Sequence, residues 1–212
     1  TPTPELFKPK VFAEMTEYVA DWKTVDKITV YPYPCKSASS TAAKIIRHYK
    51  DNGHFVLDGS RSEEAYFFVN SVREIKEILE EARLTNDDCR IICADDEKNH
   101  YKLEGFEISS STAPAKRFTF VTCKAFEGVD YYSETAICFI VSDGYNKHTL
   151  ISIDMDIPQI AGRIRTKSNP FRNKIVHIFN PKVMNYYLPF DEMKQKIAKE
   201  LAAAEERVQG LY

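Results

Sequence analysis

The run Ala136-Ile137-Cys138-Phe139-Ile140-Val141 is apolar at every position. A strand with one exposed face alternates apolar and polar residues, whereas a strand covered on both faces is apolar throughout. This run, extended to Ser142, therefore predicts a strand of a parallel sheet that is covered by helices on both faces. Other apolar, β-rich runs predict the remaining strands of this sheet: Lys27–Tyr33, Ala65–Asn70, Arg90–Ala94, Arg117–Thr122 and Lys174–Phe179.

Helical patterns fall between these strands, as a parallel sheet requires. Ser71 and Glu74 have the spacing of a capping box directly after one predicted strand, and apolar residues then follow at helical spacing through Ala82. The sequence thus predicts an α/β fold, a three-layer domain with a mostly parallel central sheet and helices on both faces. Two more helices are expected over Thr41–Lys50 and from Asp156 through Arg165, with Asp95–Lys116 mostly loop.

Composition indicates an ordinary globular protein, since 43% of the 212 residues are hydrophobic and 28% are charged. No apolar run approaches the roughly 18 to 20 residues that a membrane-spanning helix needs. The five cysteines are odd in number and most lie in strand-like runs, which predicts reduced core residues, no metal site and a cytoplasmic location. A net charge of −2 argues against a protein that coats nucleic acid through bulk positive charge.

The chain is expected to form one domain over residues 1–181, with residues 1–26 as a leading segment. Residues 182–212 carry an apolar stripe at helical spacing, with charged residues on the opposite side. This pattern predicts an amphipathic helix packed on the domain, and a helix that binds a partner is the alternative. The stripe consists of Phe190, Met193, Ile197, Leu201, Ala204 and Val208.

Polar residues follow the predicted strand Ala65–Asn70 where the next helix begins. Asn70, Ser71 and Arg73 would stand at a helix N-terminus, where free backbone N–H groups and the helix dipole favour a phosphate. These three residues are therefore predicted nucleic-acid contacts. Ser71 has a second interpretation, because a serine at this position also caps its own helix.

A second polar turn follows the strand that ends at Thr122, with the sequence Thr122-Cys123-Lys124-Ala125-Phe126-Glu127-Gly128-Val129-Asp130. The Thr122 hydroxyl would lie at the carboxyl end of a parallel strand, where ligands gather, and Lys124 adds a cation. Both are predicted nucleic-acid contacts. Gly128 permits close backbone approach, and Asp130 can accept from a ribose hydroxyl or orient an arginine, so these two are predicted nucleotide contacts. An ordinary turn is the alternative, since Gly-Val-Asp is common in turns.

The segment Gln159-Ile160-Ala161-Gly162-Arg163-Ile164-Arg165 sets two arginines beside a glycine. Arginine carries a permanent charge on a bidentate fork, which suits it to stabilise charge that develops on a transferring phosphoryl group. Arg163, Arg165 and Gln159 are the predicted catalytic residues, and Gly162 is a predicted nucleotide contact. The alternative is a helix whose arginines are merely solvated.

These three segments, in this order, resemble motifs IV, V and VI of the second RecA-like domain of superfamily 2 helicases and translocases. The resemblance spans Ala65 to Arg165, about half of the chain. It implies a RecA-like domain in which motifs IV and V hold a nucleic-acid backbone and motif VI reaches ATP. Arg163 would then act as an arginine finger, with Gln159 assisting.

The chain departs from the family pattern at the second arginine. The family places that arginine three residues after the first, where this chain has Thr166, whereas Arg165 comes two residues after. The role of Arg165 is therefore open, and Lys167 or Arg172 are alternative sources of the second charge.

The resemblance also implies a missing partner domain. No glycine precedes a Lys-Ser or Lys-Thr pair at the spacing of a P-loop, so the chain lacks the motif that holds the β- and γ-phosphates. The expected function is the second motor domain of an ATP-dependent helicase or translocase, inactive alone, with ATP and Mg²⁺ bound in a longer parent protein. The expected partners are single-stranded or duplex nucleic acid and an upstream P-loop domain, with no membrane.

Two other functions remain open from the sequence. One is a motor subunit of a restriction or DNA-repair system, which would share the same domain. The other is a degenerate RecA-like module that binds nucleic acid or protein without ATP turnover.

Overall fold

The computed structural model of the protein describes residues 27–126, 129–153 and 155–181, together with helical residues 191–195, 197–199 and 202. The chain divides into two compact units, Thr1–Pro181 and Lys182–Tyr212. The predicted leading segment, residues 1–26, lies outside the described residues. Within the second unit Met193 and Ile197 are partly exposed, and the docking of this helix on the domain stays a prediction.

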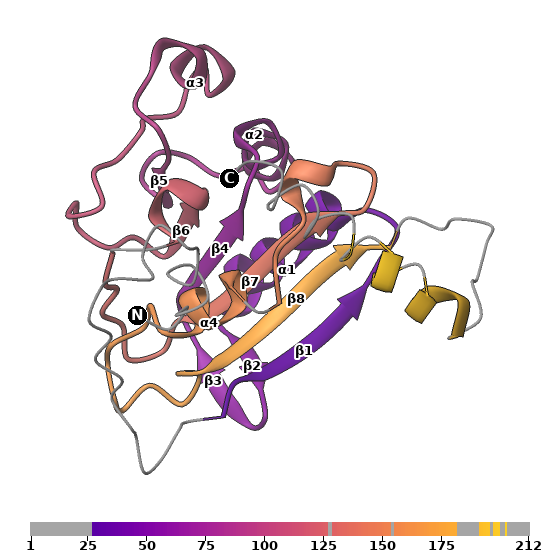
Figure 1. Cartoon of the computed structure of the whole chain (residues 1–212). Coiled ribbons are helices and arrows are strands. Elements are labelled where there is room, and N and C mark those ends of the chain that lie inside the picture. The colour runs from indigo at the N-terminus through magenta and orange to yellow at the C-terminus, as the bar shows by residue number, and fades with distance from the viewer. Residues whose placement is uncertain are drawn as a thin grey trace, which may run out of the picture. The chain divides into compact units, whose positions relative to one another are not determined.

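The central sheet of the first unit has six strands, all parallel, in the order β1-β8-β7-β4-β6-β5 (Figure 1). All six predicted strands are confirmed, each within two residues of the expected bounds. The strands are β1 (Thr29–Pro34), β4 (Ala65–Val69), β5 (Cys89–Ile92), β6 (Phe118–Val121), β7 (Ile137–Asp143) and β8 (Lys174–Asn180).

Both faces of strand β7 are buried, which explains why its sequence is apolar throughout. Ile137, Phe139 and Val141 face one buried cluster, whereas Cys138 and Ile140 face a second cluster on the other side of the sheet. Because side chains alternate between the two faces of a strand, covering both faces requires an apolar residue at every position.

Helices cover both faces and complete three layers. Helices α1 (Ala38–Asn52) and α2 (Val72–Glu81) pack on the face reached by Phe139, and α4 (Asp156–Ala161) packs on the opposite face. The predicted fold class is thus confirmed: an α/β domain with a parallel central sheet, consistent with a RecA-like three-layer fold. Among the described residues, no helix has both the length and the apolar character that crossing a membrane requires.

Three local features differ from the sequence-based expectations. The third predicted helix ends at Ala161 rather than continuing through Arg165, because the chain beyond Gly162 bonds to the backbone of Tyr131 instead. The expected loop Asp95–Lys116 contains a short helix, α3 (Glu97–Lys102), capped by the Asp96 side chain. The hairpin of β2 (Phe55–Leu57) and β3 (Ser60–Ser62) was not predicted, although Asp58 and Gly59 at its turn both have positive φ, as an Asp-Gly hairpin turn requires.

Strand β1 lies at an edge of the sheet, with β8 as its neighbour. Pro32 and Pro34 lie within it, and proline is tolerated in edge strands because its missing N–H faces away from the ladder. These prolines also leave few donors for another strand to pair with. The outer side of β1 is therefore unsuited to sheet extension.

Candidate nucleotide-facing site

The segments predicted as motifs V and VI lie side by side, although they are separated in the chain. The Tyr131 N–H donates to the Arg163 carbonyl at 2.9 Å, and the Arg165 N–H donates to the Tyr131 carbonyl at 2.9 Å. These bonds form a parallel bridge between Tyr131 and Ile164. They bring the side chains of Asp130, Arg163 and Arg165 into one cluster, which we call the arginine pair site.

Arg163 is buried within this site, with 7% of its surface exposed. Its Nε donates to the Gln159 carbonyl at 2.8 Å, and one Nη donates to the Val129 carbonyl at 3.1 Å. Asp130 Oδ1 lies 4.0 Å from the same guanidinium. Arg163 thus ties the end of α4 to the segment that precedes Tyr131.

Arg165 is placed differently, on the surface of the same site. Its Nε donates to Asp130 Oδ1 at 2.7 Å, and both side chains are close to half exposed, 45% for Arg165 and 44% for Asp130. The Asp130 carboxylate therefore contacts both guanidinium groups, and of the two only that of Arg165 reaches solvent. An exposed arginine can bind an anion through its bidentate fork.

The two other predicted motif VI residues frame this site. Gln159 is buried, with 6% exposed, in the last turn of α4. A Cβ on Gly162 would meet the Pro158 and Gln159 carbonyls at 3.5 and 3.7 Å, which are ordinary contact distances. No described neighbour therefore requires a glycine at position 162. The predicted nucleotide contact Gly128 lies outside the described residues.

Asn70, at the carboxyl end of β4, joins two neighbouring loops. Its Nδ2 donates to the His148 carbonyl at 2.7 Å, and its Oδ1 accepts from the Cys123 N–H at 3.4 Å. Both polar atoms of the Asn70 amide are therefore used within the chain. The structure places Asn70 as a link between the predicted motif IV and motif V segments.

Ser71 caps α2, because its Oγ accepts from the Glu74 N–H at 3.3 Å. The capping half of the predicted box is confirmed. The reciprocal half is not formed, since the Ser71 N–H donates to the Val69 carbonyl and the Glu74 carboxylate faces elsewhere. Arg73 next to it is 84% exposed and pairs with Glu77 one turn along the helix.

Replacing Ser71 with alanine is expected to lower the free energy of unfolding by about 1 kcal/mol, because the cap of α2 is lost. Urea denaturation of the chain measures this. Arg73→Ala is the matched control, since it removes only an exposed helical ion pair, worth about 0.5 kcal/mol or less. Equal stability of Ser71→Ala and the parent chain would show that the hydroxyl is not a cap.

Thr122 and Lys124 lie at the carboxyl end of β6. Thr122 is buried, with 7% exposed, whereas Lys124 is exposed. Lys124 lines a cavity of about 360 Å³ together with Ser110 and Asp95. Of the predicted phosphate contacts on this turn, Lys124 is the more accessible to a ligand.

The sequence alone gives no sign of the partner of Glu74. The Glu74 carboxyl is 7% exposed; its Oε1 accepts from Asn146 Nδ2 at 2.8 Å, and its Oε2 has no hydrogen-bond partner in the described part of the chain. Burial raises the pKa of this carboxyl above its usual value. Glu74 thereby fastens the loop after β7 to α2. The capping-box pattern predicts that Glu74 bonds the N-terminus of its own helix, and it gives no sign of a contact with Asn146.

Comparison with protein-family models and with curated proteins gives no match to this chain. Within the described ranges, no group of three or more His, Cys, Asp or Glu side chains is placed to hold a metal ion. The function therefore has to be argued from the site itself.

Proposed function

We propose that this chain is the second RecA-like motor domain of an ATP-dependent nucleic-acid helicase or translocase. Nucleotide binds between it and an upstream P-loop domain of the same parent protein, which works in the cytoplasm. The observation that carries the proposal is the arginine pair site, where Asp130 is held between Arg163 and Arg165. Phosphoryl transfer needs such preorganised cations where charge develops.

The contacts favour a division of labour between the two arginines. Arg165 is exposed, and Asp130 is its carboxylate partner among the described residues. Arg165 can act as the arginine finger if its guanidinium exchanges this carboxylate for a phosphate oxygen. Arg163 donates to two backbone carbonyls and acts as a positioning residue for Asp130 and the segment before Tyr131. Gln159 provides the carbonyl that holds Arg163.

The nucleic-acid backbone would run over the carboxyl ends of the strands. Lys124 and Arg73 are exposed cations at that edge, whereas Asn70, Ser71 and Thr122 shape the loops that carry them. Contacts of this kind read the phosphate backbone and not the bases, so binding would be independent of sequence. Binding that does not depend on sequence suits a protein that moves along a nucleic-acid strand.

ATP and its Mg²⁺ would be held chiefly by the upstream domain. A P-loop cradles the β- and γ-phosphates and helps to hold the metal, and this chain has no such motif. Mg²⁺ held there would supply positive charge against the negative charge that develops on the phosphates. This chain contributes charge from the opposite side of the cleft.

One observation favours a second candidate function, a RecA-like module that binds nucleic acid or protein without ATP turnover. Arg163, the residue that the family resemblance assigns as the finger, is directed at backbone carbonyls. A site in which both arginines serve only to hold the loop would bind anions without accelerating hydrolysis.

The test is ATP hydrolysis by the full parent protein, with and without single-stranded nucleic acid. We expect hydrolysis that nucleic acid stimulates, while the isolated chain, which lacks a P-loop, hydrolyses nothing. Hydrolysis that is absent from the parent under both conditions would overturn the motor function and favour the binding module.

A further inference from the structure

A groove of about 550 Å³ lies between the edge strand β1 and helix α1, away from the arginine pair site. One end is formed by residues that follow β1 and by the first turn of α1, and the other end by His48 and Phe55. From Ser37 to His48 the helix rises by about 16 Å at 1.5 Å per residue. The groove is therefore long enough for several nucleotides or an extended peptide.

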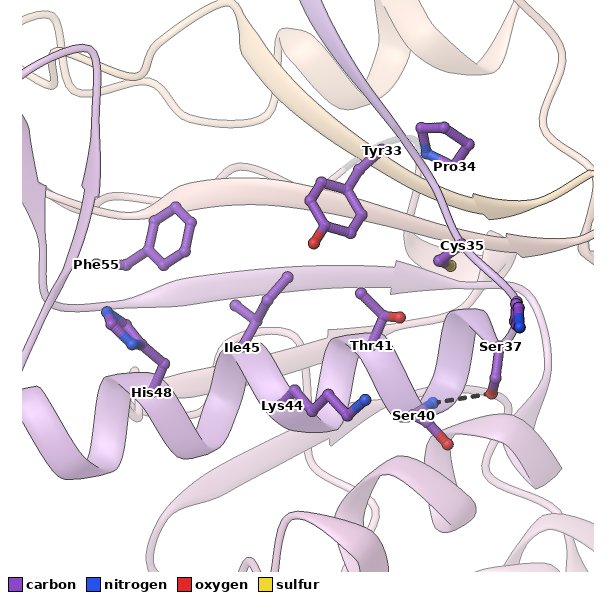
Figure 2. Close-up of a pocket in the computed structure, with 11 residues that line it drawn as sticks. Tyr33, Pro34, Cys35, Ser37, Ser40, Thr41, Lys44, Ile45, His48 and Phe55 are labelled. Atoms are coloured by element: carbon purple, nitrogen blue, oxygen red, sulfur yellow. Dashed lines mark hydrogen bonds between the residues drawn. The ribbon is translucent and has the colours of Figure 1, made fainter.

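Two aromatic rings line the groove, the exposed ring of Tyr33 and the half-buried ring of Phe55. Tyr33 is 52% exposed, and Figure 2 shows its ring directed from β1 towards Ile45 on α1. Phe55 stands further along the groove, where it packs edge-on against His48. An exposed ring such as that of Tyr33 offers a flat surface on which a base can stack.

The polar lining of the groove carries positive charge. Lys36 and Lys44 line it together with the hydroxyl-bearing residues Ser37 and Thr41, and none of the described residues that line it is Asp or Glu. In the part of the chain that the structure describes, neither lysine forms a salt bridge. Lysines beside an exposed aromatic ring complement the phosphates and bases of a single strand.

We propose that this groove binds a segment of single-stranded nucleic acid, with one base stacked on Tyr33 and phosphates held by Lys36 and Lys44. This inference rests on the proposed function. It adds a surface for nucleic acid beyond the loops that follow β4 and β6. From the end of β4 to the end of β1 is three strand spacings, about 14 Å at 4.8 Å each. About four stacked nucleotides, rising about 3.4 Å each, span that distance.

The test is binding of a short fluorescein-labelled oligothymidylate to the full chain, followed by anisotropy at several salt concentrations. Tyr33→Ala is expected to weaken binding by about tenfold, and Tyr33→Phe, which keeps the ring, by less than about twofold. Lys44→Gln is expected to lower the slope of log affinity against log salt by about 0.7. Tyr101→Ala is the matched control, because Tyr101 is 84% exposed on α3 and does not line the groove.

The outcomes separate this inference from the proposed function. If the wild-type chain binds the oligonucleotide and Tyr33→Ala binds it with the same affinity, the groove is not a site for single-stranded nucleic acid. The proposed motor function is not affected by that result. A wild-type chain that binds no oligothymidylate would overturn the groove as well, while ATP hydrolysis by the parent reports on the motor independently. Equal losses for Tyr33→Ala and Tyr101→Ala would likewise count against the groove.

Discussion

Replacing Arg165 with alanine is expected to reduce nucleic-acid-stimulated ATP turnover by the parent protein about a thousandfold, with nucleotide affinity largely kept. An arginine finger acts on charge that develops in the transition state, so its loss lowers kcat far more than it raises KM. Arg165 fits that role because its guanidinium is 45% exposed and held by one carboxylate, Asp130, at 2.7 Å. Steady-state kinetics at saturating nucleic acid measure the effect.

Lys167→Ala is the control for this prediction. Lys167 is an exposed cation two residues further along, so its loss removes a similar charge from the same surface. A decrease in turnover of less than about threefold is expected, since an exposed charge that does not contact the nucleotide acts only through screened attraction. Similar losses for Arg165→Ala and Lys167→Ala would indicate a general charge effect and would contradict the finger.

Asp130 supplies a further test of the same geometry. Asp130→Asn keeps the shape of the side chain but weakens its hold on both guanidinium groups, which lie 2.7 and 4.0 Å from Oδ1. We expect turnover to fall by about tenfold to a hundredfold, because a finger that is not preorganised must be ordered during the reaction. A rate unchanged from wild type would show that Asp130 does not position Arg165.

The buried strands were predictable because a strand that is covered on both faces has to be apolar throughout. Phe67 packs against one buried cluster and Tyr66 against the other, so β4 had to be apolar throughout and its sequence revealed it. The cap of α2 was predictable for a similar reason, since Ser71 acts on a backbone group only three residues away. Local and repetitive constraints leave their pattern in a short stretch of sequence.

The orientation of the two arginines could not be predicted in the same way. A continuous helix through Arg165 would have projected both side chains from one helix, but α4 ends at Ala161 and the chain then bridges to Tyr131. That bridge depends on a segment far away in the sequence. The pairing of Glu74 with Asn146 was hidden for the same reason, since the two residues lie 72 positions apart.

Replacing Arg163 with alanine is expected to lower the free energy of unfolding of the chain by about 2 to 4 kcal/mol. The substitution leaves two carbonyls, of Gln159 and Val129, without the guanidinium donor that now reaches each of them, and an unsatisfied buried acceptor costs about 1 to 3 kcal/mol. Urea denaturation measures the loss, and Arg163→Met tests the guanidinium alone, because it keeps an apolar stem.

The two arginine variants should therefore rank in opposite order in loss of stability, measured by urea denaturation, and in loss of ATP turnover. Arg165→Ala removes an exposed ion pair, which is worth less than about 1 kcal/mol of stability, while it abolishes most turnover. Arg163→Ala destabilises the fold more. Its turnover, measured where the variant is fully folded, falls less than that of Arg165→Ala, because Arg163 positions Asp130 and the segment before Tyr131 and does not contact the phosphate. An Arg163→Ala variant as stable as wild type but without turnover would reverse the assignment. Arg163 would then leave its carbonyl acceptors to reach the phosphate, as the family resemblance implies.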